Sequence, residues 1–245
     1  MTIPPAAIVR ARADLAATGA AVLQGFVPKP QAAGMLAEVE DRLDKAFFKV
    51  KTHNVYLVAD DPAFAADHPR NRKVTTSSAT LAYDLVPDGA LRRLYLNDRF
   101  RAGLAAILGH DALYPYADPL AGLNLLTYPP GTETGWHFDN ANFVVTLMLR
   151  PADAGGDYHY IPATRTEEDP GFDAVERALD GDGSEIVSLH QAAGDLVIFQ
   201  GRHTLHRVTP VKGLKPRVIA VCSYDPKPGK ILHKDTRMTF YGRAA

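Results

Sequence analysis

Residues 135–139 carry side chains that could bind a metal ion. They read GWHFD, in which His137 and Asp139 are two positions apart. Side chains two positions apart on a β-strand point to the same face, and burying an imidazole and a carboxylate without partners costs free energy. A bound metal would offset that cost. An ordinary histidine–carboxylate pair on a half-buried strand is the alternative for these two residues taken alone.

A second segment supplies two more histidines and an arginine. GDLVIFQGRHTLHRVTPV contains His203 and His206, and Arg217 begins the apolar run RVIAVCSY. Two histidines and one carboxylate on one face of a metal form the facial triad of non-haem Fe(II) oxygenases, which leaves positions open for a cosubstrate and O2. Because Arg217 enters an apolar strand, we expect it to point inward and bind an anion. A solvated arginine at a strand end is the alternative.

Together these phrases resemble the Fe(II)/2-oxoglutarate-dependent dioxygenases, which share a double-stranded β-helix core. The resemblance rests on His137-Phe138-Asp139, on His206 within HRVTPV, and on Arg217 eleven residues later. It implies that His137, Asp139 and His206 bind Fe(II), and it favours His206 over His203. It also implies that Arg217 binds the remote carboxylate of 2-oxoglutarate, a task that suits a planar guanidinium, and that O2 is the second cosubstrate.

A closer likeness is carried by GWHFDNANFVVTLMLR, GDLVIFQGRHTLHRVTPV and TRMTFYGR. These are similar to the radical amino-acid halogenases (the HalD/BesD type) and their hydroxylase relatives, closely over roughly residues 115–245 and more loosely before them. Such halogenases have Gly or Ala in place of the carboxylate, which leaves a coordination position for chloride. Because this chain has Asp139, the resemblance implies a hydroxylase. Its substrate would be a small polar metabolite, such as a free amino acid or a derivative, and its coproducts succinate and CO2.

Three alternatives stay open at this point. One is halogenation or another oxidative outcome, such as desaturation or cyclisation, on the same iron. The second is a cupin-like module that binds metal without catalysis. The third, a nucleic-acid demethylase, would need a basic groove with stacking aromatic residues, and no segment supplies one.

Further residues are candidates for binding 2-oxoglutarate. Asn124 and Tyr128 lie on one face of the expected strand LNLLTY. In related dioxygenases an Asn or Tyr from this strand often hydrogen-bonds 2-oxoglutarate. A buried polar pair that satisfies a neighbouring strand is the alternative.

Three residues are candidates for contact with the substrate. Thr134 and Asn140 flank the expected triad, and Arg72 in HPRNRKVTTSS could hold a substrate carboxylate unless it is an exposed loop arginine. Trp136 should face away from the site and pack in the core, because its neighbour His137 faces inward.

The sequence before residue 115 is expected to be a helix-rich support region. GAAVLQGFV predicts a strand. QAAGMLAEVEDRLDKAF predicts an amphipathic helix, since Leu36, Val39, Leu43 and Phe47 recur at helical spacing. A second helical stretch should cover roughly 89–108, with Gly109 ending it.

From about residue 121, short β-like runs alternate with Gly, Pro and Asp. This texture is typical of a jelly roll. We therefore expect a mainly β protein with flanking N-terminal helices (α+β) and a double-stranded β-helix (jelly-roll, cupin-like) core. One domain would span residues 1–245, with the core in 115–245. A polar excursion at 164–184, with a short helix at 173–179, would lie near one mouth of the barrel as a lid.

Composition restricts the partners. The 245 residues carry a formal net charge of −1, so no general attraction to nucleic acid or anionic membrane is expected. Cys222 is the only cysteine, and neither a secretion signal nor a bilayer-length apolar run is evident. We expect a cytoplasmic enzyme of a small-molecule substrate that binds neither nucleic acid nor membrane. The sequence does not determine its oligomeric state.

Overall fold

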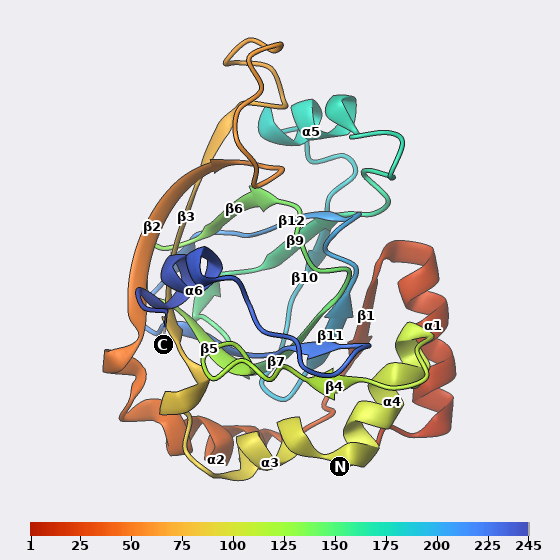
Figure 1. Cartoon of the computed structure of the whole chain (residues 1–245), viewed down its shortest axis with the longest axis vertical. Coiled ribbons are helices and arrows are strands. Elements are labelled where there is room, and N and C mark those ends of the chain that lie inside the picture. The colour runs from red at the N-terminus through yellow and green to blue at the C-terminus, as the bar shows by residue number, and fades with distance from the viewer. Residues whose placement is uncertain (245) are drawn as a thin grey trace.

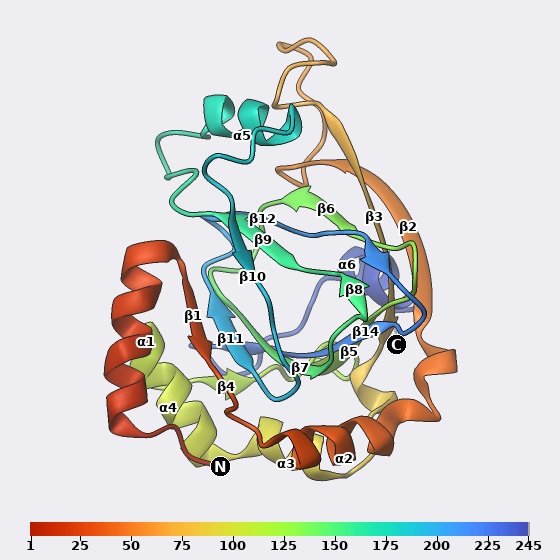
Figure 2. The ribbon, with the colours of Figure 1, turned by 180° about the vertical axis from the view of Figure 1, so that it is seen from behind.

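Most strands join one antiparallel sheet that curls over on itself, as seen in a computed structural model that describes residues 1–244 (Figures 1 and 2). The strand order is β1-β11-β7-β14-β5-β3-β6-β12-β9-β10, with β2 paired to β3. The strands of this sheet are β1 Ala20–Leu23, β2 Phe47–Asn54, β3 Lys73–Leu81, β5 Leu123–Tyr128, β6 Thr134–His137, β7 Val144–Arg150, β9 Tyr158–Ile161, β10 Val187–Leu189, β11 Leu196–Phe199, β12 Leu205–Val208 and β14 Arg217–Cys222. Two short pairs stand apart: β4 Tyr114–Pro115 with β15 Tyr224–Asp225, and β8 Ala154–Gly155 with β13 Val211–Lys212.

Strand β3 joins the two halves of the curled sheet. Its C-terminal residues pair with β5 through Leu81 and Leu125, whereas Thr76 pairs with Thr134 of β6. The larger half is therefore β1-β11-β7-β14-β5-β3, and the smaller half is β6-β12-β9-β10. The halves face each other in Figure 1, which confirms the predicted jelly-roll core.

Four helices cover the outer face of the larger half: α1 Pro5–Thr18, α2 Lys29–Glu40, α3 Ala90–Leu96 and α4 Asp98–Leu108. Strand alternation decides which side chains meet them. On β7, Val145, Leu147 and Leu149 pack in the cluster that contains the helices, whereas Val144 and Met148 pack in the cluster inside the barrel. One face of the sheet thus builds the main core and the other lines the interior.

Two helix predictions need correction. Helix α2 ends at Glu40, and Phe47, placed in that helix by its spacing, begins β2 and is 38% exposed. The alternating sequence FFKVKTHN fits a strand better than the four-residue spacing fits a helix. The stretch 89–108 is two helices, because the Asn97 side chain accepts a hydrogen bond from Phe100 N and caps a new helix there. Gly109 ends α4 with φ 74°, as predicted.

The supposed support region also contributes strands to the sheet itself. Besides β1, it supplies β2 and β3, which form a long curved ribbon (Figure 1). The sequence KVTTSSATL of β3 is rich in β-branched residues, which favour strands. Because β3 pairs with both β5 and β6, residues 73–81 belong to the barrel.

The polar excursion contains α5, Phe172–Leu179, which confirms the predicted short helix. Its Val175 and Ala178 pack with Trp136 and Phe138 on the outside of the smaller half. The helix therefore covers the barrel wall, and the prediction of a lid is wrong for α5. A C-terminal helix, α6 Lys234–Tyr241, lies across the ribbon instead.

No helix within residues 1–244 is long and apolar enough to cross a membrane.

Candidate metal centre

The three predicted ligands meet where strands β6 and β12 of the smaller half pair with each other. His137 ends β6 and is the direct register partner of His206 on β12. Asp139 follows two residues later, and its backbone N–H donates to Gly201 O at 2.9 Å. Its Oδ1 lies 3.5 Å from His137 Nε2 and its Oδ2 3.5 Å from His206 Nε2. One donor atom of each residue lies within 4.8 Å of the others, a spacing that suits one metal ion.

Backbone carbonyls orient both imidazoles. His137 Nδ1 lies 2.9 Å from Gly135 O, and His206 Nδ1 lies 2.9 Å from Thr204 O. A carbonyl accepts only, so each Nδ1 carries the hydrogen and each Nε2 presents a lone pair toward the centre.

Burial disfavours a positive charge on His206. Burial, aided by the neighbouring His137, lowers the pKa of His206 to about 4, so His206 is neutral at physiological pH. Burial raises the pKa of Asp139, but the opposing effects of His206, His137 and Arg165 outweigh it, and the net pKa lies below the usual value. Oδ2 of this carboxylate is buried without a hydrogen-bond partner among residues 1–244. Two lone pairs and an unpartnered carboxylate oxygen fit a divalent cation.

Gly201 has no side chain, and the Asp139 carboxylate occupies the space that a Cβ at this position would need. A Cβ at residue 201 would collide with Asp139 Oδ2 and lie 2.6 Å from its Cγ. The glycine therefore fixes the position of the carboxylate by the absence of a side chain. Sequence reasoning missed this role, although GxH after a strand offered a signal.

The neighbouring aromatic residues lie as expected. His203 is half-exposed, with Nε2 3.9 Å from a Glu167 carboxylate oxygen, and it is not part of the cluster. Trp136 is buried on the outer side of the wall, with the Arg207 guanidinium 4.6 Å from its ring centroid. This confirms that Trp136 faces away from the centre.

A cavity of about 460 Å³ opens beside the three ligands. Apolar side chains of the larger half form much of its wall: Leu126, Val144, Val197, Phe199, Ile219 and Val221. Arg217, Tyr128 and Tyr158 also line it, and the Tyr158 ring centroid lies 5.6 Å from that of His206. The lining thus combines an apolar wall with polar groups that reach from the three ligands to the arginine.

Arg217 is buried, with only 2% of its surface exposed. Its Nη2 donates to Gln191 Oε1 at 2.8 Å, while Nε and Nη1 have no partner among the described residues. The Tyr128 ring lies 5.4 Å from the guanidinium carbon. Burial lowers the pKa of Arg217, which Tyr128 and Asp157 partly oppose. The unpartnered Nη1 of this buried guanidinium can donate to a carboxylate oxygen.

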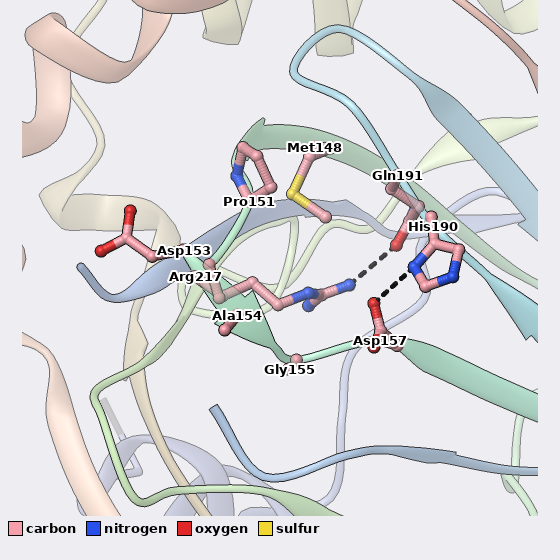
Figure 3. Close-up of a pocket in the computed structure, with 11 residues that line it drawn as sticks. Met148, Pro151, Asp153, Ala154, Gly155, Asp157, His190, Gln191 and Arg217 are labelled. Atoms are coloured by element: carbon pink, nitrogen blue, oxygen red, sulfur yellow. Dashed lines mark hydrogen bonds and ion pairs between the residues drawn. The ribbon is translucent and has the colours of Figure 1, made fainter. Parts of the chain in front are cut away.

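Figure 3 shows Arg217 from a second, smaller cavity of about 330 Å³. The guanidinium points between Gln191 and Asp157, and Asp157 binds His190 Nδ1 at 2.8 Å. Gln191 and Arg217 line both cavities. These two side chains therefore lie between the larger cavity, beside the candidate metal centre, and the smaller one.

The remaining predicted residues divide into two pairs. Thr134 and Asn140 line the large cavity, and the Thr134 hydroxyl donates to Tyr128 Oη at 3.1 Å. Asn124 lies farther along β5, where its Nδ2 donates to Ala121 O at 3.3 Å, and does not line the cavity. Arg72 also lies outside, since its Nη1 pairs with Asp180 at 2.5 Å.

Long-range structure explains these last two placements. Strand β5 lines the cavity from Leu126 to Tyr128 only, so sharing a face with Tyr128 does not bring Asn124 to it. Arg72 meets a carboxylate 108 positions away at the end of α5, which sequence spacing could not indicate. The structure does not bring either residue to the metal centre.

The chain matches the family described as Halogenase D over residues 3–237. It belongs to the Halogenase D family. Among curated proteins, none matches this chain.

Solved structures share the fold of this Halogenase D family member at low identity. A 2OG-Fe(II) oxygenase family oxidoreductase from Burkholderia pseudomallei is 14% identical, with a TM-score of 0.57, over 94% of this chain and 96% of the other. A Pseudomonas putida prolyl-4-hydroxylase is 15% identical, with a TM-score of 0.51, over 90% and 99%. The epimerase SnoN, in complex with Fe3+, alpha ketoglutarate and nogalamycin RO, is 17% identical, with a TM-score of 0.61, over 90% and 84%.

Proposed function

We propose that this member of the Halogenase D family is an Fe(II)/2-oxoglutarate-dependent hydroxylase. Its substrate would be a small polar metabolite with an unactivated C–H bond, such as a free amino acid or a derivative. The observation that carries the proposal is the Asp139 carboxylate, which lies 3.5 Å from Nε2 of each histidine and lacks a partner for Oδ2. A cytoplasmic location is part of the proposal, in keeping with a single, buried cysteine.

The polar groups described above each have a place in this proposal. His137, Asp139 and His206 would hold the iron, with both imidazoles oriented by their backbone carbonyls. Arg217 would bind the remote carboxylate of 2-oxoglutarate through its free Nη1. The bound iron supplies the oxidising chemistry, with O2 and 2-oxoglutarate consumed and succinate and CO2 released.

Tyr128 supports the arginine. It lies against the Arg217 guanidinium and accepts a hydrogen bond from Thr134, so its own hydroxyl hydrogen is free for a ligand. The apolar wall around these groups excludes water, which strengthens the charged hydrogen bonds and keeps the reaction away from solvent. The chain's contribution is to position the reactants and to limit side reactions.

Asp139 favours hydroxylation over halogenation. The Halogenase D family is named for halogen chemistry, and the resemblance described above places Gly or Ala at this position in such halogenases. Here a third protein ligand fills that position, so no protein-free coordination site is left for chloride there. The shared fold with a prolyl-4-hydroxylase supports an oxygenase.

The test is to incubate the iron-loaded protein with 2-oxoglutarate, O2, chloride and a panel of amino acids and derivatives. We expect succinate and a product that has gained one oxygen atom. A chlorinated product would refute the role given to Asp139. Metal binding without any 2-oxoglutarate consumption would favour the cupin-like binding module.

A matched variant sharpens this test. Asp139→Ala should lose hydroxylation and leave a coordination position open to chloride. Hydroxylation at the wild-type rate in Asp139→Ala would show that the carboxylate does not hold the metal.

A further inference from the structure

We infer that Lys49 and Lys51 form a second anion-binding site in the cavity, which holds an ionised acid group of the substrate. The inference rests on the proposed function, because it concerns the substrate of the same cavity. The ligand group would be a carboxylate or a phosphate, both of which present anionic oxygen atoms to an ammonium group.

Strand alternation turns both lysines into the cavity. Lys49, Lys51 and His53 occupy every second position of β2 and all line the cavity. The opposite face of the strand is open, since Phe48 is 51% and Val50 64% exposed. The lysines therefore belong to the lining of the cavity and not to the outer surface of the ribbon.

Helix α6 closes over Lys49. The Nζ of Lys49 lies 3.8 Å from the centroid of the Phe240 ring, and Thr239 and Phe240 line the same cavity. An aromatic ring attracts the ammonium group and holds it in one place without neutralising it. The lysine is thus positioned while its charge stays available.

Neither lysine has a carboxylate partner. Within residues 1–244 no Asp or Glu oxygen lies within 4.0 Å of Nζ of Lys49 or Lys51, whereas Lys73 on the neighbouring strand pairs with Asp60. Asp235 of α6 lines the same cavity, but its side chain contacts His233. Lys49 is half-buried, so it loses hydration that a ligand can replace. Lys51 is exposed and adds a second positive charge beside it.

Electrostatics agree with this arrangement. Burial, and secondarily the charge of Lys51, lower the pKa of Lys49 to about 7. From β3 only the uncharged Thr76 and Ser78 line the cavity, so no anion on that strand compensates. A bound anion would supply the missing charge and restore the protonated form.

This site is separate from Arg217. Strand β2 pairs with β3, β3 with β5 and β5 with β14, so the lysines lie three strands away from Arg217. At the usual spacing between strands this is roughly 14 Å across the sheet. One end of the cavity would thus hold the cosubstrate carboxylate and the other the acid group of the substrate.

The test compares acids with their uncharged counterparts. The panel contains free L-amino acids, each paired with its carboxamide, and O-phosphoethanolamine paired with ethanolamine. The Lys49→Gln/Lys51→Gln double variant should raise KM for the acid at least tenfold and leave KM for the carboxamide and for 2-oxoglutarate unchanged. Lys234→Gln, an exposed lysine of α6 outside the cavity lining, is the matched control and should behave as wild type.

A second measurement does not depend on turnover. In Zn(II)-substituted protein with 2-oxoglutarate and ¹³Cε-labelled lysine, NMR titration gives the pKa of Lys49, identified by its loss in Lys49→Gln. An acid of the panel should raise this pKa and its carboxamide should not. A shift with the phosphomonoester alone would identify phosphate as the group that is bound.

The outcomes separate the two proposals. A raised Lys49 pKa without succinate from any panel member would support the anion site and refute the hydroxylase. Succinate with equal KM changes for acid and carboxamide would support the hydroxylase and overturn the anion site. If no panel member moves the Lys49 pKa, or if the double variant changes KM for 2-oxoglutarate instead, the anion site is overturned.

Discussion

Gly201 is the residue whose substitution tests the metal centre most directly. In Gly201→Ala the new Cβ would lie 2.6 Å from Asp139 Cγ and 2.9 Å from Asp139 Cβ. The carboxyl group must therefore shift by roughly 1 Å to regain ordinary van der Waals separation. The backbone hydrogen bond from Asp139 N–H to Gly201 O holds the two residues together. Moving the two segments apart would break this bond, so it cannot relieve the strain without a further cost.

We expect this shift to weaken iron binding and catalysis together. Changes to groups that orient metal ligands typically cost about 10- to 100-fold in affinity or activity, and a misplacement of about 1 Å has a similar cost in rate. Fe(II) affinity, measured anaerobically by competition with a chelator, should fall by that factor. Succinate formation at saturating iron should fall as well. Wild-type affinity in a folded Gly201→Ala protein would refute the reasoning.

Two controls isolate the cause. Gly34 lies within α2, and a Cβ there would meet nothing within 4 Å, so Gly34→Ala should leave iron binding unchanged. Adding Gly201→Ala to Asp139→Gly should cause little further loss, because the group that it displaces is already gone. A full additional loss in the double variant would mean that Gly201 acts on some other part of the site.

Three further predictions concern the other parts of the molecule. Arg217→Gln should raise KM for 2-oxoglutarate by roughly a hundredfold with little effect on KM for the substrate; equal effects in steady-state kinetics would contradict its role. Because Lys49 has a pKa of about 7, it loses its proton as the pH rises through 7, and KM for an acidic substrate should then increase. Lys49→Arg, which stays charged, should flatten that profile, and a flat wild-type profile would count against the anion site. Phe100→Ala, which empties a fully buried position of α4, should lower the free energy of unfolding by about 3–5 kcal/mol in urea titration, and a loss below 1 kcal/mol would show that the outer core repacks.

Local pattern was enough to predict which side chains meet at the candidate metal centre. His137 and Asp139 share a face because strand side chains alternate, and Trp136 faces the opposite core for the same reason. The phrase HRVTPV indicated His206, which is the direct register partner of His137 on the adjacent strand. These features depend on periodicity within one strand and on a recurrent motif, both of which a single sequence carries.

Features that depend on distant segments could not be predicted in this way. Arg72 pairs with Asp180, which is 108 positions away in the sequence. Asn124 does not line the cavity, because the cavity does not extend that far along β5. The role of β3 was missed because its Ser and Thr residues also suit loops. Lys49 and Lys51 were missed although FFKVKTH alternates, since alternation shows a shared face without showing that this face is covered.

Four buried polar atoms without partners lie where we propose that ligands bind. Asp139 Oδ2, Arg217 Nε and Nη1 and Tyr158 Oη are buried and unpartnered, and each would cost free energy if it stayed so. All of these residues line the larger cavity, as do the two unpaired lysines. The cost is tolerable because the opposite face of the same strands packs against the four N-terminal helices. The sheet thus separates the two requirements: its outer face stabilises the fold, and its inner face presents the charged groups that metal, cosubstrate and substrate would satisfy under the proposed function.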